Sequence, residues 1–359
     1  MEYLKNIYLE KIKKQKTGFI FFYLGIFLLP SAFFVASISL FIASIYGCIY
    51  KKENYFSDKW NKLLFISGCI MVINSILQKF FFENNFEGIW DPNLTLIGLG
   101  NWLPLFWIFW TLQPYLEGEK NRKATALILI SGSFPVLFTG FAGLFLNWDG
   151  GPYQTLNGLI TWYLDKSYGL VFSGLFSNPN YAGNWLVIML PICIACFYQT
   201  MNKLRKAVVS ILIIAILIAI YLTKSRNALV GTLLSLSFTI NWFYLLLLVG
   251  VLALVLFSFF LPSSFQTIIR KIIPKNISHN FSNFGLSNLF QYPRFFIWFN
   301  AFEFILEKPF IGWGAASFPI LFEEKNNIYR GHSHNIFFEL SISYGLIVST
   351  ILAIFVFLL

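Results

Sequence analysis

Long apolar segments separated by short polar stretches dominate the sequence. They lie at residues 18–30, 31–50, 63–82, 94–115, 124–146, 183–200, 205–222, 227–240, 242–261 and 336–357. A helix needs about 20 apolar residues to cross the ~30 Å hydrocarbon layer of a bilayer, and a backbone in lipid must satisfy its own hydrogen bonds. These segments do not alternate polar and apolar residues as the strands of a membrane barrel do. The pattern predicts an all-α polytopic membrane protein with about ten transmembrane helices.

The composition agrees with this class. Of the 359 residues, 57% are hydrophobic, 20% are aromatic and only 12% are charged. A water-soluble protein of this length needs far less apolar surface, so we expect residues 1–359 to form a single transmembrane domain. The N-terminus has a basic start and an apolar stretch, but the stretch continues to about Tyr50, far beyond the ~7–15 residues of a signal-peptide core. We therefore predict two retained helices, separated near Pro30.

The basic residues predict the orientation of the chain. Fifteen of the 26 Lys and Arg residues lie in the N-terminal segment or in alternate short loops, namely Lys5, Lys11, Lys13, Lys14, Lys16, Lys51, Lys52, Lys59, Lys62, Lys120, Arg122, Lys123, Lys203, Arg205 and Lys206. The opposite short loop, residues 83–93, has three acids and no Lys or Arg. Because short cytoplasmic loops are enriched in Lys and Arg, we predict a cytoplasmic N-terminus. The same distribution explains the net charge of +10 without a nucleic-acid partner.

Two long segments are expected on the outer side of the membrane. The first is an extracytoplasmic loop at residues 147–182, and the second is a large extracytoplasmic loop at residues 262–335, directly before the last helix. The printed sequence ends on "IFVFLL", inside or just past an apolar run, which suggests that a final helical hairpin is not included.

Several site types have no support in the sequence. All four cysteines lie in apolar segments, and the C-x-x-C at Cys193 and Cys196 lacks the further ligands that hold a metal. We expect these cysteines to pack between helices, and we predict no metal site. The sequence also has no nucleotide-binding glycine loop, no H-E-x-x-H and no obvious Ser-His-Asp arrangement.

Four ionisable residues stand out among those on the predicted outer side. Arg226 lies in a very short turn between two apolar segments, Arg294 lies in the large loop, and His332 and His334 end that loop. Charges at the edge of a bilayer are costly unless they reach water or a polar cavity. Guanidinium groups bind phosphate through paired hydrogen bonds, and a histidine accepts a proton near neutral pH. Together these residues suggest a transfer reaction on a lipid diphosphate, in which arginines take the place of a metal.

Simpler interpretations of the same residues stay open. Arg226 is equally well explained as an interfacial anchor, and Arg294 as an ordinary loop cation. The two histidines are also compatible with the capped start of a helix, since Ser333 or Asn335 can supply the capping oxygen. Histidines two positions apart do not share a helical face, which argues against a two-histidine metal site.

Four motifs resemble those of the O-antigen ligase and polymerase superfamily of membrane glycosyltransferases. "KSRNALVGTLLSL" resembles the family's S-R-[GA] helix start, although this chain has Asn227 where the family often has Gly or Ala. "PRFFIWFNAFEFILEKPFIGWGAASF" is similar to its R-x-x-x-W…P-x-x-G-x-G-x-x-x-F pattern, and "HSHNIFFELSISYGLIV" to H-[ST]-H-N-x-x-x-E…G. "FSNPNYAGNWLVIMLP" resembles an Asn-rich element before a middle helix. The resemblance covers about residues 170–359.

The resemblance implies metal-independent glycosyl transfer without a cofactor, in a bacterial inner membrane with the active site on the periplasmic face. The donor would be an undecaprenyl-diphosphate-linked glycan, and the acceptor a hydroxyl on a lipid-linked or protein-linked molecule. By this resemblance Arg226 and Arg294 engage the donor diphosphate, and His334 activates the acceptor hydroxyl. His332 and Asn335 are assigned as neighbouring substrate-binding residues. The motifs do not separate a ligase from a polymerase, because the two differ in the acceptor.

Two other functions stay open from the sequence. Relatives of the same superfamily have been described as inorganic-carbon accumulation proteins, so a transporter or an accessory protein for inorganic carbon uptake is the main alternative. A transporter places polar groups at mid-membrane depth, and here only Asn74, Gln78 and Lys79 are such residues. A non-catalytic assembly factor for surface polysaccharide is the third possibility.

Overall fold

The computed structural model describes residues 16–50, 55–81, 90–146, 148, 154–155, 160–161, 171–176, 178–240, 243, 246, 250 and 293–358. The chain divides into two compact units, and we describe each by itself. Unit 1 contains Met1–Lys51 and Thr111–Leu261, and unit 2 contains Lys52–Trp110 and Pro262–Leu359. Several predictions lie outside the described residues: most of the helix at 242–261, residues 262–292 of the large loop, most of the loops at 83–93 and 147–182, and Lys5, Lys11, Lys13, Lys14, Lys51 and Lys52.

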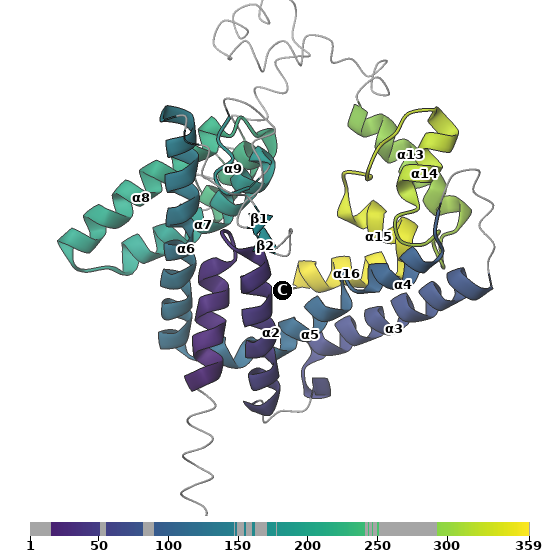
Figure 1. The fold of residues 1–359 in the computed structure, drawn as a ribbon, viewed down its shortest axis with the longest axis horizontal. Coiled ribbons are helices and arrows are strands. Elements are labelled where there is room, and N and C mark those ends of the chain that lie inside the picture. Colours follow the sequence, from purple (N-terminus) through teal and green to yellow (C-terminus); the bar gives the residue numbers. More distant parts are fainter. Residues whose placement is uncertain are drawn as a thin grey trace, which may run out of the picture. The chain divides into compact units, whose positions relative to one another are not determined.

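The described elements are almost entirely helical (Figure 1). Unit 1 has a helix at Lys16–Leu28, followed by α2 (Phe33–Tyr50), η2 (Gln113–Leu116), α6 (Glu119–Phe145), α7 (Pro179–Gln199), α8 (Lys203–Leu222) and α9 (Arg226–Ile240). Unit 2 has η1 (Tyr55–Ser57), α3 (Lys59–Phe80), α4 (Asn93–Leu99), α5 (Leu103–Thr111), α13 (Pro293–Glu307), α14 (Phe318–Asn326), α15 (Ile336–Tyr344) and α16 (Leu346–Leu358).

The prediction of a helical membrane protein is confirmed in its main point. Within the described ranges, five helical stretches are long and apolar enough to span a bilayer: Lys59–Phe80, Asn93–Thr111, Glu119–Phe145, Pro179–Gln199 and Lys203–Leu222. Shorter apolar helices lie at Lys16–Leu28, Phe33–Ile49 and Leu346–Leu358. Among the described elements, the only strands form a minimal antiparallel pair, β1 (Gln154–Thr155) and β2 (Ile160–Thr161). The total of ten spans stays a prediction.

Polar side chains fix where several helices begin. Asp58 accepts a hydrogen bond from the backbone N–H of Trp60 and starts α3, and Asn202 does the same for Arg205 at the start of α8. Asn178 accepts from the N–H of Asn180 at the start of α7. A cap of this kind satisfies one of the backbone donors that the first turn leaves without a partner. These caps place the helix starts two to four residues before the apolar segments that predicted them.

The core of unit 1 forms where α6, α7, α8 and α9 pack together. Its fully buried residues include Val136, Leu186, Leu190, Ile216 and Ala228. α7 packs closely against α9, because Gly183 has no side chain: a Cβ there would lie 2.6 Å from the Cβ of Ala228. Small residues at such a crossing allow two membrane helices to approach each other closely.

The last helix differs from its prediction. Residues 336–357 were expected to form one span, but the structure divides them into α15 and α16 at Gly345. Gly345 has φ +90°, a conformation that favours glycine, and a Cβ there would collide with the carbonyl oxygen of Phe310. The break therefore depends on a turn that comes from another part of the chain.

Helix α3 supplies the hydrogen bonds that stabilise this break. The side-chain amide of Asn74 donates to the carbonyls of Phe310, at 3.0 Å, and of Tyr344, at 2.7 Å. Gln78 donates to the carbonyls of Ile311, at 2.5 Å, and of Ser343, at 3.2 Å. Both side chains are buried. The carbonyls of Ser343 and Tyr344 are ones that the interrupted helix leaves without intrahelical partners, and those of Phe310 and Ile311 belong to the turn that meets the break.

Two further segments have structure that the sequence did not predict. The segment 94–115 is not one continuous helix, since a turn at Gly100–Trp102 separates α4 from α5. The large loop 262–335 is partly helical, because it contains α13 and α14. The apolar side chains of these two helices, among them Ile297, Phe304 and Phe322, pack against Ile342 of α15 and form their own core. Burial of this amphipathic surface explains why residues without a membrane-spanning pattern are helical.

Candidate functional site

His334 lies in a tight turn directly before α15. Its φ of +55° places the backbone in the left-handed region, which few residues other than glycine adopt. Asn335 follows in an extended conformation, and its side-chain oxygen accepts from the backbone N–H groups of Phe337, at 2.9 Å, and Phe338, at 3.4 Å. The prediction that Asn335 or Ser333 caps the last helix is thus confirmed for Asn335. A strained backbone at a polar turn is a feature of many functional sites.

Ser333 and Glu339 fix the conformation of this turn. The backbone N–H of Ser333 donates to the Glu339 carboxylate, with 2.9 Å between N and Oε2. The hydroxyl of Ser333 donates to the carbonyl of Asn335 at 2.9 Å, which bridges the two residues on either side of His334. Ser333 is completely buried, whereas His334 is exposed. The turn therefore presents the imidazole outward from a fixed backbone.

The surroundings of His334 favour its neutral form. Its ring lies 4.2 Å from that of His332, measured between centroids. Partial removal from water, and then electrostatic interactions with His332, Arg294 and Arg330, hold the pKa of His334 below its usual value. A neutral imidazole has a free lone pair, so His334 is able to accept a proton at neutral pH.

Arg294 reaches the same region from the start of α13. Helix α13 packs on α15, with the rings of Trp298 and Phe338 6.3 Å apart, and Ile297 and Ile342 share one buried cluster. Figure 1 shows α13, α14 and α15 side by side within unit 2. Arg294 is exposed, and its charge acts on His334. Four of the five residues that the sequence singled out, Arg294, His332, His334 and Asn335, therefore belong to unit 2, where Arg294 and His332 both act on His334.

Arg226 lies in unit 1, as the first residue of α9. The preceding Ser225 is buried, and its hydroxyl accepts from the N–H of Ala228 at 3.3 Å and donates to Oδ1 of Asn180 at 2.6 Å. This bond joins the starts of α7 and α9. Lys224, one residue earlier, has φ +53°, so the chain reverses sharply between α8 and α9. Arg226 is exposed at a place where two helix N-termini meet, and such ends favour anions.

Comparison with known proteins adds to this geometry. Residues 210–353 match the model of the O-antigen ligase family. This segment of the chain is an O-antigen ligase domain. No curated protein and no solved structure matches the chain. The domain match supports membrane glycosyltransferase activity of the O-antigen ligase or polymerase type.

The O-antigen ligase domain contains every site residue that the sequence suggested. It starts within α8 and ends within α16, so it includes Arg226, Arg294, His332, His334 and Asn335. The resemblance of residues 170–209, including the element at the start of α7, lies before the matched segment. The O-antigen ligase domain thus contributes residues to both compact units.

Two residues of this O-antigen ligase domain were missed in the sequence. Arg330 precedes His334 by four residues, and its charge acts on the imidazole. Glu339 holds the backbone of the turn. A signal for Glu339 was present, since an acidic residue occupies this position in the motif H-[ST]-H-N-x-x-x-E. Arg330 had none, because a single cation in a long loop has no distinguishing pattern.

Proposed function

We propose that the protein transfers a glycan from an undecaprenyl-diphosphate donor to a hydroxyl acceptor on the outer face of the membrane, as an O-antigen ligase or polymerase does. The observation that carries this proposal is geometric: inside the segment that matches the O-antigen ligase family, the imidazole of His334 faces outward before α15, and α13, which has Arg294 in its first turn, packs on α15. The acceptor is a lipid-linked or protein-linked molecule. The active site faces the periplasm.

In the proposed reaction His334 is the general base. It takes the proton of the acceptor hydroxyl while that oxygen attacks the anomeric carbon of the donor glycan. The bond between the anomeric carbon and the diphosphate oxygen breaks, and undecaprenyl diphosphate leaves with both electrons of that bond. The negative charge that develops on the diphosphate is compensated by guanidinium groups, which bind phosphate oxygens in pairs.

Arg294 and Arg226 are the proposed diphosphate-binding residues. Arg294 is supported by its electrostatic action on His334, because the donor's leaving group must lie close to the base. Arg226 is supported by its place at the joined starts of α7 and α9, where helix dipoles and backbone N–H groups also attract a phosphate. His332 and Asn335 are proposed to contact the substrate at the same turn.

Reconstituted protein provides the test. Proteoliposomes that contain the full chain are supplied with a glycan on undecaprenyl diphosphate and with a hydroxyl acceptor, and glycosylated acceptor and released undecaprenyl diphosphate are measured together. We expect equal amounts of both products. We also expect Arg294→Gln and Arg226→Gln each to reduce the rate by about a hundredfold, because each loses a charge-assisted contact to the leaving group. Uptake of labelled bicarbonate without either product would instead support the transport alternative.

A further inference from the structure

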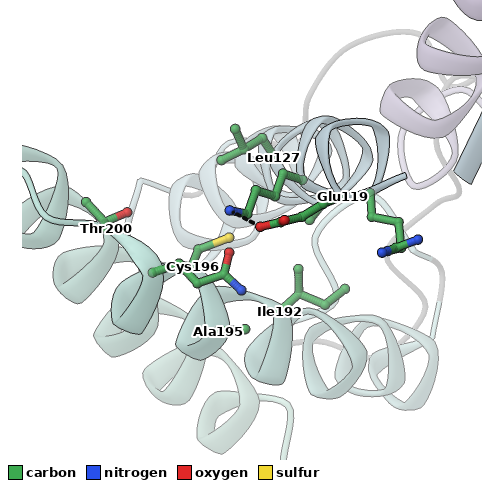
Figure 2. A pocket seen from close by; sticks show the side chains of 10 residues that line it. Glu119, Leu127, Ile192, Ala195, Cys196 and Thr200 are labelled. Atoms are coloured by element: carbon green, nitrogen blue, oxygen red, sulfur yellow. Dashed lines mark ion pairs between the residues drawn. The ribbon is translucent and has the colours of Figure 1, made fainter. Parts of the chain in front are cut away.

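Unit 1 contains a cavity that the proposed reaction does not use. It has a volume of about 370 Å³ and lies between the first turns of α6 and the last turns of α7. Figure 2 shows Glu119 and Leu127 on one side, with Ile192, Ala195, Cys196 and Thr200 on the other. Its volume is in the range of small-molecule sites.

The cavity has a polar end and an apolar end. Arg122, Lys123, Glu119, Gln199 and Thr200 form the polar end, which lies at the termini of the two helices. Towards the interior of both helices the lining becomes apolar, with Ala126, Leu127, Ile192 and Ala195. The change from charged to apolar within two helical turns matches the change from headgroup to acyl chain across a bilayer surface.

The polar end has an excess of positive charge. Lys123 forms an ion pair with Glu119 at 2.6 Å, while Arg122 uses one of its five N–H donors for a long contact with the carbonyl of Leu116, at 3.4 Å. Four more cations, none of which lines the cavity, lie on the first turn of α6 and on the first turn of α8: Lys120, Lys203, Arg205 and Lys206. Against these six cations stand only Glu117 and Glu119 at the start of α6. An anion at this end is therefore favoured.

This end of the bundle is the predicted cytoplasmic one. Both helices are candidate membrane spans, and their charged termini belong to the loops that the distribution of Lys and Arg assigns to the cytoplasm. Basic pockets between membrane helices on this side bind the headgroups of anionic lipids.

We propose that this cavity binds an anionic phospholipid of the cytoplasmic leaflet. The phosphate of the lipid contacts Arg122 and competes with Glu119 for Lys123, and the first methylene groups of one acyl chain cover Ala126, Leu127 and Ala195. A soluble anion would use the polar end alone and would leave the exposed Leu127 uncovered. This site is separate from the transfer reaction, and it would tie α6 to α7 at the membrane surface.

Native mass spectrometry of the full chain in detergent tests the proposal. The protein is titrated with dioleoyl phosphatidylglycerol and, separately, with dioleoyl phosphatidylcholine. We expect the anionic lipid to bind more tightly, and the Arg122→Gln/Lys123→Gln double variant to weaken its binding about tenfold. The matched control, Lys203→Gln/Arg205→Gln, removes the same charge from two residues that do not line the cavity, and it should change binding by less than about twofold.

A second variant tests the apolar end without a change of charge. Ala195 is exposed to the cavity, so Ala195→Trp fills the space without disturbing the buried core, and it should also weaken phosphatidylglycerol binding. Wild-type elution in gel filtration verifies the fold of each variant. The two variants change different helices, so each one tests by itself whether the cavity binds the lipid. Equal binding of both lipids, an equal loss in the control variant, or displacement of the lipid by millimolar inorganic phosphate would overturn the proposal.

Discussion

The carboxylate of Glu339 accepts a hydrogen bond from the backbone N–H of Ser333, with 2.9 Å between the two atoms. The bond spans six residues and closes the turn that contains His334. It joins the first turn of α15 to the residue before His334. The left-handed backbone of His334 is also held by the Ser333–Asn335 contact. The position of the proposed base therefore depends on a residue that does not itself need to touch the substrate.

Replacement of Glu339 should reduce transfer without preventing membrane insertion. In Glu339→Ala the buried N–H of Ser333 loses a charged acceptor, and such a bond contributes about 1.5–3 kcal/mol. We expect the transfer rate to fall roughly tenfold or more, with Glu339→Asp partly active. The exposed Glu323 is the matched control, and Glu323→Gln should have wild-type activity in the same proteoliposome assay. Equal activity of the Glu339 and Glu323 variants would contradict this role.

The acid side of the pH–rate profile should depend on Arg330. Because the pKa of His334 is lowered, the imidazole stays neutral to a lower pH than the usual value of about 6.5, and base catalysis is lost only as the pH falls through the lowered pKa. In Arg330→Gln one repelling charge is gone, so the pKa should rise and activity should be lost at a higher pH. The shift should be larger at low salt.

A matched charge removal controls this experiment. Lys325 is already paired with Glu303 at 2.7 Å, so Lys325→Gln should leave the acid side of the pH–rate profile unchanged. If the acid side of the pH–rate profile does not move in Arg330→Gln, then the charge of Arg330 does not affect the pKa of His334.

Asn74 should be important for stability. Its amide satisfies two carbonyls at the break between α15 and α16, and Asn74→Ala leaves both without this donor. We expect thermal unfolding in detergent to show a loss on the order of 2–4 kcal/mol. Asn121 donates to the carbonyl of Glu117 at 2.8 Å in an exposed position, so Asn121→Ala should cost less than about 1 kcal/mol. Similar losses for the two variants would mean that the break does not need Asn74.

Two glycines of similar backbone conformation allow the cost of backbone strain to be distinguished from the cost of a steric collision. Gly345 has φ +90° and ψ 159°, and Gly118 has φ +78° and ψ 154°. An alanine is strained at either position, by about 1–3 kcal/mol. At Gly118 a Cβ meets no atom within 4 Å, whereas at Gly345 it collides with the carbonyl of Phe310. Gly345→Ala should therefore be destabilised by at least about 2 kcal/mol more than Gly118→Ala in thermal unfolding. An equal loss of stability in the two variants would show that the turn at Phe310 moves to accommodate the added methyl group.

The sequence predicted the helices well where a single apolar segment decides the structure. The segments 205–222 and 227–240 became α8 and α9 with almost the same bounds, because their length and composition alone favour helix in lipid. The cap on the last helix was also predictable, since Asn335 acts on its own first turn. Local chemistry determines both.

The break at Gly345 was not predictable in this way. It needs the turn at Phe310 and Ile311 and the amides of Asn74 and Gln78. These amides come from residues more than 230 positions before the carbonyls that they contact in this turn. Asn74 and Gln78 drew attention in the sequence as polar groups of a possible transport path. Their amide groups instead donate to backbone carbonyls, which gives them a structural role in unit 2. A polar residue in a membrane helix does not by itself reveal which partner it has.

Arg294 and Arg330 illustrate the same limit at the site. The motif that contains Arg294 pointed to the correct residue, but its electrostatic action on His334 follows from the packing of α13 on α15 through Trp298 and Phe338. Such contacts between distant segments cannot be derived from spacing alone.

The transfer rate of His334→Ala, measured beside that of His332→Ala in proteoliposomes with a glycan on undecaprenyl diphosphate, tests the proposed base most directly. Both variants remove one exposed imidazole from the same turn, so they should insert equally. We expect His334→Ala to lose at least about a hundredfold in rate, as the loss of a general base does. His332→Ala should lose much less, because His332 is proposed to contact the substrate without taking its proton. Transfer at the wild-type rate by correctly inserted His334→Ala would contradict the assignment.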